Sequence, residues 1–282
     1  MLPVRLIPRL DIKGPNVVKG IHLEGLRVIG RPDKMARYYY EAGADELFFM
    51  DTVASLYERN SLGEIISKTA SEIFIPLTVG GGLRTLQDMA TVLRAGADKV
   101  CLNTAAIKNP NIIKESSRSL GSSTIVVAIE AIREPNGSYL AYTDNGREYT
   151  GVDVFEWAKK VEELGAGEIV LTSVDKEGTG EGFDLELIKR VSENASIPVI
   201  AHGGAGSHQH IIDVMQMGKA DAVAVASVLH YEYARNNLLD STDSAEGNTE
   251  FIRSGRSFKN FQTSTIGDIK TEMLDAGLAV RI

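Results

Sequence analysis

Short apolar segments alternate with amphipathic segments of helical length along most of the 282-residue chain, and this alternation constrains the fold more than any other feature. The apolar segments are bounded by Gly, Pro, Asp or Asn and are rich in branched aliphatic residues, as buried parallel strands are. We expect strands at residues 5–10, 46–50, 73–79, 99–102, 124–129, 168–171, 197–201 and 222–225. We expect helices at residues 31–42, 62–72, 86–95, 111–120, 154–164, 185–194 and 208–217.

Repeated strand–helix units predict an α/β protein with a parallel sheet, either closed as a (β/α)₈ barrel or open and doubly wound. An open sheet usually has one dominant glycine-rich loop after its first strand, and no such loop follows residues 5–10. The sequence therefore favours a (β/α)₈ TIM barrel. Such a barrel takes about 250 residues, so residues 1–282 are expected to form a single domain.

The second half of the chain repeats features of the first half. The segment EAGADEL at 41–47 resembles ELGAGEI at 163–169, and IPLTVGGG at 75–82 resembles IPVIAHGG at 197–204. Both pairs are separated by 122 positions, and two matches at one offset indicate an internal duplication. We expect two half-barrels of four strand–helix units each, related by a pseudo-two-fold axis.

One polar segment interrupts the alternation. It covers about residues 236–268 and is rich in Ser, Thr, Asn and Gly. It separates the eighth strand from a last helix expected at 269–276. We therefore predict a polar insertion in the last βα loop, and connections of that length are usually functional or disordered.

Composition excludes several functions. The net charge of −8 disfavours nucleic acid or an anionic membrane as the main partner, although it does not exclude a local phosphate site. The single cysteine, Cys101, allows no intrachain disulfide and no Cys-rich zinc site, and no His-Glu-x-x-His pattern is present, so we expect no metal. The first residues lack a signal-peptide pattern, and no apolar run approaches the roughly 18 residues of a membrane span. We expect a cytoplasmic protein.

Two carboxylates occupy equivalent strand ends of the two halves. The functional residues of a (β/α)₈ barrel lie at the C-terminal ends of its strands. Asp11 follows the first strand and Glu130 ends the fifth. Two facing carboxyl groups suit general acid–base catalysis, because like charges push their pKa values apart. Alternatively, each is a structural carboxylate satisfied by a loop N–H group or a salt bridge.

Glycine pairs recur on opposite sides of the same barrel mouth. Glycine lets the backbone approach an anion closely, so two such sites suggest a substrate with a phosphate at each end, although tight turns are the alternative. The neighbouring strand-end loops would supply further N–H and hydroxyl donors. Lys19 lies in a glycine-containing loop that is either a lid carrying a cation or a solvated loop. The candidate phosphate- or substrate-binding residues are Gly81, Gly82, Asn103, Thr104, Thr172, Glu177, Gly203, Gly204, Ala226 and Ser227.

Alternating charges lie near the starts of four strands. They are Arg5, Glu46, Lys99 and Glu168. They are expected to form either a salt-bridged ring that closes the barrel floor or ordinary structural ion pairs.

The motifs resemble the HisF family, the cyclase subunits of imidazole glycerol phosphate synthase. The resemblance runs from residue 1 to about 232, and the related HisA isomerase barrel fits less well at 11–20 and 97–106. The matching segments are IPRLDIK (7–13), VVKG (17–20), TVGGG (78–82), ADKVCLNTAA (97–106), GAGEI (165–169) and AHGGAG (201–206).

The resemblance implies a lyase that needs no cofactor and receives ammonia from a HisH-type glutaminase docked on the N-terminal barrel face. Ammonia would pass the charged ring and attack a bisphosphorylated formimino aminoimidazole carboxamide ribotide. The products would be imidazole glycerol phosphate and aminoimidazole carboxamide ribotide, in histidine biosynthesis. The family's two catalytic aspartates correspond to Asp11, expected as general acid, and Glu130, expected as general base, with Lys19 on the first loop.

Four positions on the substrate side depart from the family pattern. Glu130 stands where the family has Asp, Arg9 where it usually has Cys, and His202 where it usually has Ser or Cys. Glu177 replaces the second Asp of an Asp-Arg-Asp-Gly-Thr loop. These departures support an alternative, a HisF-like ammonia-channelling subunit for amidating a bacterial surface-polysaccharide sugar. A further alternative is a non-catalytic scaffold that activates a glutaminase.

Overall fold

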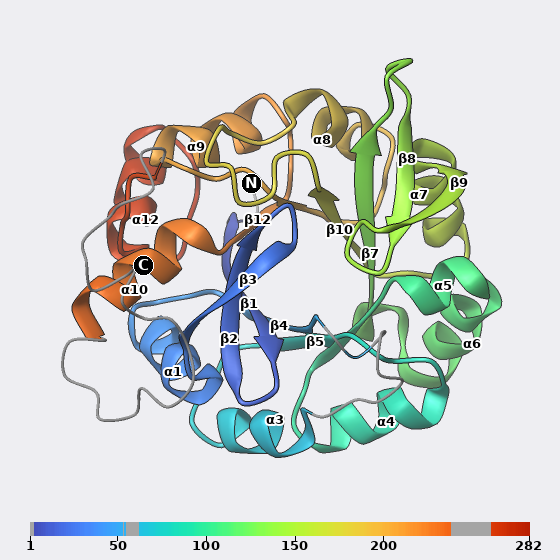
Figure 1. Cartoon of the computed structure of the whole chain (residues 1–282), viewed down its shortest axis with the longest axis horizontal. Helices are drawn as coiled ribbons and strands as arrows, with labels where there is room; N and C mark the ends of the chain where they lie inside the picture. The colour runs from blue at the N-terminus through green and yellow to red at the C-terminus, as the bar shows by residue number, and fades with distance from the viewer. Residues whose placement is uncertain (1–2, 53, 55–61, 238–260) are drawn as a thin grey trace.

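The computed structural model describes residues 3–52, 54, 62–237 and 261–282. Within these residues, parallel strands form a closed ring in which each strand bonds to the next and β12 returns to β1 (Figure 1). This confirms the predicted (β/α)₈ barrel. In ring order the strands are β1 (Arg5–Lys13), β4 (Leu47–Asp51), β5 (Leu77–Gly80), β6 (Lys99–Leu102), β7 (Ile125–Arg133), β10 (Glu168–Ser173), β11 (Val199–His202) and β12 (Ala222–Val225).

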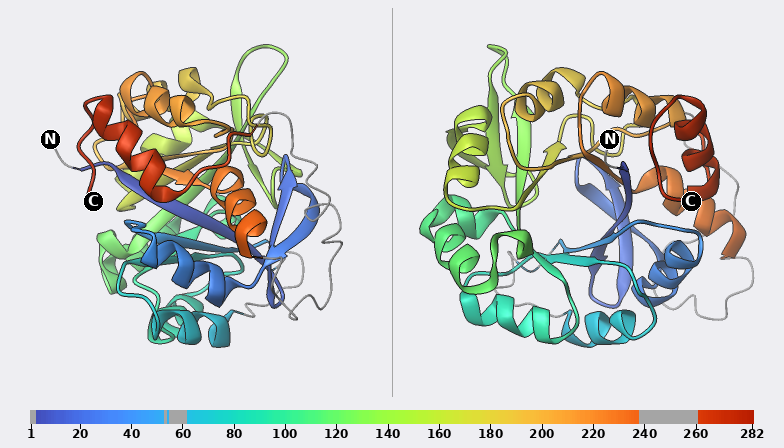
Figure 2. Two further views of the ribbon diagram at one scale, coloured as in Figure 1. Left: turned by 90° about the vertical axis from the view of Figure 1, so that its left-hand side faces the viewer. Right: turned by 180° about the vertical axis from the view of Figure 1, so that it is seen from behind.

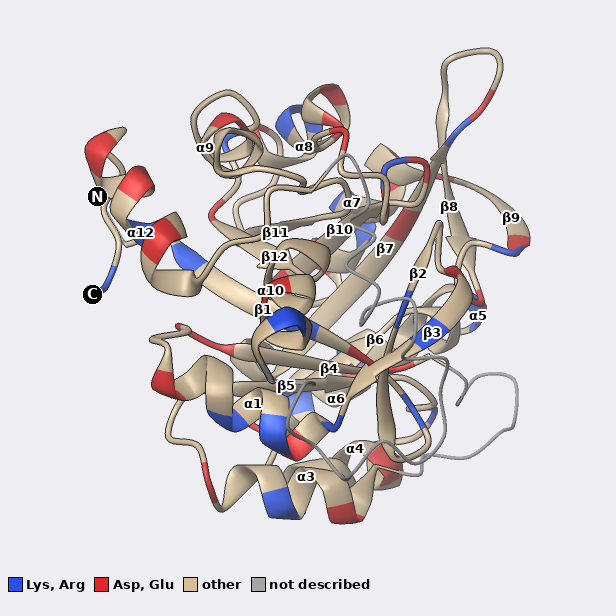
Figure 3. Ribbon diagram, turned by 60° about the vertical axis from the view of Figure 1, so that its left-hand side comes forward, with Lys and Arg blue, Asp and Glu red and all other residues tan. Residues whose placement is uncertain are grey.

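Helices surround the strands on the outside, and both ends of the chain lie at the amino face of the barrel (Figure 2). There Val4 and Val280 form an isolated parallel bridge. The outer helices are α1 (Pro32–Glu41), α3 (Gly63–Ala70), α4 (Leu86–Arg94), α6 (Asn111–Leu120), α7 (Val154–Glu163), α8 (Leu185–Ser192), α9 (His208–Gln216) and α12 (Ile266–Asp275). Both acidic and basic residues occur on α1, α3 and α12 (Figure 3). Most of them are solvated, but Asp33 of α1 and Lys270 of α12 are buried.

Several elements lie in segments that the sequence analysis treated as loops. Two antiparallel hairpins follow equivalent strands of the two halves and extend β1 and β7. Two helices and a short 3-10 turn also form within loops. These elements are β2 (Asn16–Ile21), β3 (Glu24–Gly30), β8 (Tyr139–Thr143), β9 (Glu148–Asp153), α5 (Thr104–Lys108), α10 (Ser227–Asn237) and η1 (Ser122–Thr124).

The predicted polar insertion at 236–268 is shorter than expected at both ends. Helix α10 continues through Asn237, and α12 begins at Ile266 rather than at 269. The reason at the second boundary is a capping box, in which the Thr265 side chain and the Asp268 carboxylate each accept a backbone N–H. Residues 238–260 lie outside the described part of the chain.

Side chains of the strands point alternately out of the barrel and into its lumen. On β1, Leu6, Leu10 and Ile12 belong to the large cluster between strands and helices, and Ile7 belongs to a separate cluster inside the barrel. The residues of this inner cluster are Ile7, Phe48, Met50, Cys101, Val126, Ala128, Val170, Ile200, Ala222 and Ala224. The charged residues of β1 therefore share the lumen with Ile7.

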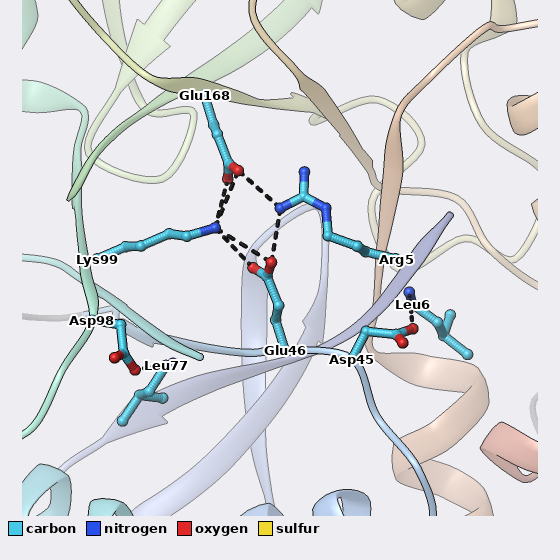
Figure 4. Close-up of polar contacts among 8 residues, drawn as sticks. All are labelled: Arg5, Leu6, Asp45, Glu46, Leu77, Asp98, Lys99 and Glu168. Atoms are coloured by element: carbon cyan, nitrogen blue, oxygen red, sulfur yellow. Dashed lines mark hydrogen bonds and ion pairs between the residues drawn. The ribbon is translucent and has the colours of Figure 1, made fainter. Parts of the chain in front are cut away.

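A Gly-Ala-Asp segment precedes the second and fourth barrel strands, and related segments precede the sixth and eighth. The carboxylates of Asp45, Asp98 and Asp221 each accept a backbone N–H from the preceding strand of the ring, at 2.8, 2.8 and 2.9 Å. Figure 4 shows the first two of these aspartates. At the sixth strand Gly167 stands in place of the aspartate and its own N–H donates to the Ile125 carbonyl at 2.8 Å. The duplication thus has a finer, quarter-barrel repeat at the amino face.

The two glycines of the Gly-Ala-Asp segments give a matched test of packing. Gly43 and Gly96 have φ values of +90° and +118°. A Cβ added at Gly96 would lie 2.4 Å from the Ala70 Cβ, whereas a Cβ added at Gly43 would have no neighbouring atom of the described residues within 4 Å. We expect Gly43→Ala to cost about 1–2 kcal/mol from backbone strain. Gly96→Ala should cost a further ~1–3 kcal/mol from overpacking. Chemical denaturation measures both, and equal costs would contradict the packing argument.

Candidate active site at the carboxyl face of the barrel

A cavity of about 420 Å³ opens at the carboxyl ends of β4, β5, β6 and β7. Five predicted site residues line it, namely Gly81, Gly82, Asn103, Thr104 and Glu130. The other polar residues of its wall were not among the predicted site residues; they are Asp51, Arg84, Lys108, Asp144 and Asn145. Arg84 and Lys108 follow the predicted glycine and Asn-Thr motifs by only a few positions. Their nearness to these motifs in the sequence could have identified them as site residues.

The glycine pairs have the backbone conformations that glycine tolerates best. Gly81 and Gly82 have φ values of +95° and +69°, and a Cβ at Gly81 would lie 2.3 Å from the Asp51 carbonyl oxygen. The second pair, Gly203 and Gly204, has φ values of +92° and +111°. These glycines follow β11, and Ser227 begins α10 nearby in the ring. The positive φ values of both glycine pairs therefore agree with tight turns as well as with phosphate binding.

Glu130 is a buried carboxyl group held by the turn of the β8–β9 hairpin. Its Oε2 accepts the Gly146 N–H at 2.9 Å. Asp144, Asn145 and Gly146 all have positive φ, and the Asn145 amide donates to the Thr52 carbonyl at 2.7 Å, which ties the turn to the loop after β4. Burial raises the pKa of Glu130 to about 7, although Arg9, the Gly146 N–H and Asn103 oppose the rise. Glu130 can therefore exchange a proton near neutral pH.

Asp11 lies in the lumen in an ion pair with Arg9, which is 3% exposed. The Arg9 Nε donates to Asp11 Oδ1 at 3.0 Å, and its Nη1 lies 3.2 Å from His202 Nδ1 and 3.5 Å from Thr172 Oγ1. Burial, followed by the charges of Arg9 and Lys19, holds the pKa of His202 well below its usual value. His202 is therefore neutral and accepts the Arg9 hydrogen bond.

Lys19 does not join the two carboxylates in this structure. It comes from β2 and forms a buried ion pair with Glu177, in the loop after β10. Glu177 also accepts the Leu23 N–H at 3.0 Å, and its carbonyl accepts the His22 N–H at 2.9 Å. Among the described residues, no hydrogen bond links Lys19 to Asp11 or Glu130. The β2–β3 hairpin is thus fastened across the mouth.

At the opposite end, the four charged residues expected at the barrel floor form a closed ring (Figure 4). Arg5 lies 2.8 Å from both Glu46 and Glu168, and Lys99 lies 3.1 Å from both. The two carboxylates raise the pKa of Arg5 although burial alone would lower it. The lumen therefore ends in a salt-bridged constriction at the amino face.

The fold and site define a (β/α)₈ barrel that carries two buried carboxyl groups, Asp11 and Glu130, toward its carboxyl face. Residues 5–235 match the family described as "Histidine biosynthesis protein". Three relatives share one name, imidazole glycerol phosphate synthase subunit HisF. The Legionella pneumophila relative is 61% identical over 206 residues, covering 73% of this chain and 97% of that protein. The Methanocaldococcus jannaschii relative is 48% identical over 250 residues, covering 82% and 92%. The Bacillus cereus relative is 43% identical over 282 residues, covering all of both chains.

The chain belongs to this histidine biosynthesis family, and within it to the HisF subunits of imidazole glycerol phosphate synthase. This confirms the resemblance seen in the sequence and the expectation of a cyclase. The word subunit in the relatives' names implies a partner subunit. These names give no support to the surface-polysaccharide alternative. In the described part of the chain, no helix is long and apolar enough to cross a membrane.

The raised pKa of Glu130 predicts how stability changes with pH. Between its ordinary pKa of 4.5 and about 7, the folded protein holds a proton that the unfolded chain has released. The contribution of Glu130 to stability therefore falls as pH rises through this window. Glu130→Gln has no proton to lose in this window. Its free energy of unfolding, relative to that of the wild type, should therefore rise by about 3 kcal/mol as the pH increases from 4.5 to 7. Urea denaturation at several pH values measures this, with exposed Glu64→Gln as control; a constant difference for Glu130→Gln would contradict it.

Proposed function

We propose that this chain uses ammonia from a HisH-type glutaminase to convert the formimino ribotide into imidazole glycerol phosphate and aminoimidazole carboxamide ribotide. One observation carries the proposal: the charged ring and the two carboxyl groups lie at opposite ends of one barrel interior, whose middle layer is apolar. Between them the lumen is lined by apolar residues such as Ile7, Val126 and Val170. An uncharged molecule as small as ammonia suits such an apolar interior. We also propose that the chain acts in the cytoplasm.

In this proposal the two glycine pairs bind the two phosphates of the substrate. Gly81, Gly82, Asn103 and Thr104 share one cavity, so they hold the first phosphate together. The second phosphate binds on the other side of the mouth, at Gly203, Gly204, Ala226 and Ser227. Thr172 and Glu177 contribute through the cations they contact, Arg9 and Lys19. Lys19 acts on the substrate after leaving Glu177.

The glutaminase docks on the amino face, where the charged ring opens. Exposed apolar side chains gather around this end of the barrel, because they lie just after outer helices or just before strands. Phe74 is 83% exposed and precedes β5, and Met217 is 50% exposed and follows α9. Leu274 and Ile282 are exposed at the end of α12 and of the chain. An apolar rim around a polar centre suits a protein partner.

Asp11→Asn tests the cyclase reaction. With the formimino ribotide and ammonium salt at alkaline pH, the variant should lose on the order of 10²–10⁴-fold in kcat, because one proton-transfer group is removed. Asp175→Asn is the matched control, since Asp175 lies on the same face and accepts the Arg133 N–H at 2.9 Å. Full turnover by Asp11→Asn would contradict the catalytic role of Asp11. No turnover by the folded wild type would contradict the cyclase function and favour a scaffold that only activates a glutaminase.

Lys99→Met tests the path through the floor. The substitution leaves Arg5 as the only cation of the ring that contacts Glu46 and Glu168, so one side of the ring loses its ion pairs. We expect ammonia-driven turnover to change less than twofold, while product formed per glutamine hydrolysed falls several-fold. Lys270→Met is the control, because Lys270 forms a buried ion pair with Asp45 at 3.0 Å near the same face but outside the ring. Equal losses with both nitrogen sources would argue against a path through the ring.

A further inference from the structure

Arg9 is a buried cation at the reaction site, and the proposed function does not say how it acts on the two carboxyl groups. It projects from β1 into the lumen, where its guanidinium contacts Asp11, Thr172 and His202. Its Cζ also lies 5.6 Å from the centre of the Phe48 ring. Four barrel strands therefore fix its position, directly below the mouth of the barrel.

The contacts of Arg9 make Asp11 its counter-charge. Burial alone would lower the pKa of Arg9, but nearby carboxylates, Asp11 first and then Glu177 and Glu130, raise it above its ordinary value. His202 is neutral and Thr172 carries no charge, so neither can balance the guanidinium. If Asp11 were protonated before the reaction, the buried guanidinium would lack its hydrogen-bonded carboxylate in the resting site. The geometry therefore favours Asp11 as the ionised member of the pair.

Glu130 has the opposite surroundings although it is the pseudo-symmetric partner of Asp11. The position two residues before it, which corresponds to Arg9, is Ala128. Its closest donor is the Gly146 N–H, and no ion pair of Glu130 occurs among the described residues. The charged or titratable groups that face it are Arg9 from β1, Asp144 from the β8–β9 turn and the buried Cys101 thiol of β6. The amide of Asn103 completes its surroundings.

We propose that Arg9 is a positioning residue that sets different tasks for the two carboxyl groups: Asp11 accepts a proton and Glu130 donates one. This assignment rests on the proposed cyclase function and reverses the roles expected from the resemblance. When ammonia adds to a substrate carbonyl, the new C–N bond forms as the carbonyl electron pair moves to oxygen. Asp11 removes one proton from nitrogen, and Glu130 delivers its proton to oxygen. Glu130 then regains a proton from solvent in the cavity that it lines, and Asp11 gives up its proton at the barrel mouth before the next turnover.

The pH dependence of kcat separates the two assignments. The assay keeps the concentration of free ammonia, rather than total ammonium, constant across the pH range. If Glu130 is the donor, kcat should fall about tenfold per pH unit above about 7, where Glu130 loses its proton. If Glu130 were the acceptor, kcat would instead fall below that pH. The second result would overturn the proposal.

Substitution of Arg9 tests its positioning role. The charge of Arg9 lowers the pKa of Glu130, so Arg9→Met should move the alkaline limb of kcat to higher pH. It should also reduce kcat at least tenfold with little change in KM. Arg9→Lys keeps the charge and should leave the limb in place. A limb that stays unmoved in Arg9→Met would show that Arg9 has only a structural role.

Infrared spectroscopy of the protein without substrate tests the same assignment independently of turnover. At pH 6 the protonated-carboxyl band should be present in the wild type and in Asp11→Asn, and one component should be lost in Glu130→Gln. Loss of the component in Asp11→Asn, with retention in Glu130→Gln, would overturn the proposal even if Arg9→Met fails to fold. Because no substrate is used, failure of the cyclase function and failure of this assignment give different results.

Discussion

A charge that a closed parallel barrel buries in its interior needs a counter-charge or hydrogen-bond partner there, because little water reaches it. Strand β1 shows the constraint most clearly, since its inward residues are Arg5, Ile7, Arg9 and Asp11. Arg5 is balanced by two glutamates of other strands at the amino face. Arg9 is balanced by Asp11 on its own strand. The apolar layer around Ile7 separates these two charged layers, so the lumen connects two chemically distinct ends.

The sequence predicted the barrel because its strands are short, apolar and regularly spaced. It also singled out Arg5, Glu46, Lys99 and Glu168 at or near strand starts, but it did not decide between a closed ring and separate ion pairs. The pairing of Arg9 with Asp11 was also available from sequence, because residues two apart on a strand share one face. Its further contacts with β10 and β11 depend on the barrel register, which no local pattern encodes.

The sequence patterns did not predict the two hairpins or their contacts, for a different reason. β2 and β8 extend β1 and β7 as short antiparallel strands whose residues also read as polar, glycine-containing loops. Lys19 therefore looked like a residue of an open lid. Its partner Glu177 is 158 positions away in the sequence. The ion pair forms only because the hairpin folds across the mouth of the barrel. Such a contact is set by tertiary packing alone.

The two hairpins also explain how the duplicated halves form one site. The β2–β3 hairpin reaches the loop after β10, the sixth strand of the ring, through Glu177. The β8–β9 hairpin reaches the loop after β4, the second strand, through Asn145 and Thr52. The second and sixth strands are equivalent in the duplication, so each half covers the same loop of the other half. One hairpin holds Lys19 and the other holds Glu130, and a substrate that spans both of the proposed phosphate sites would therefore engage both halves at once.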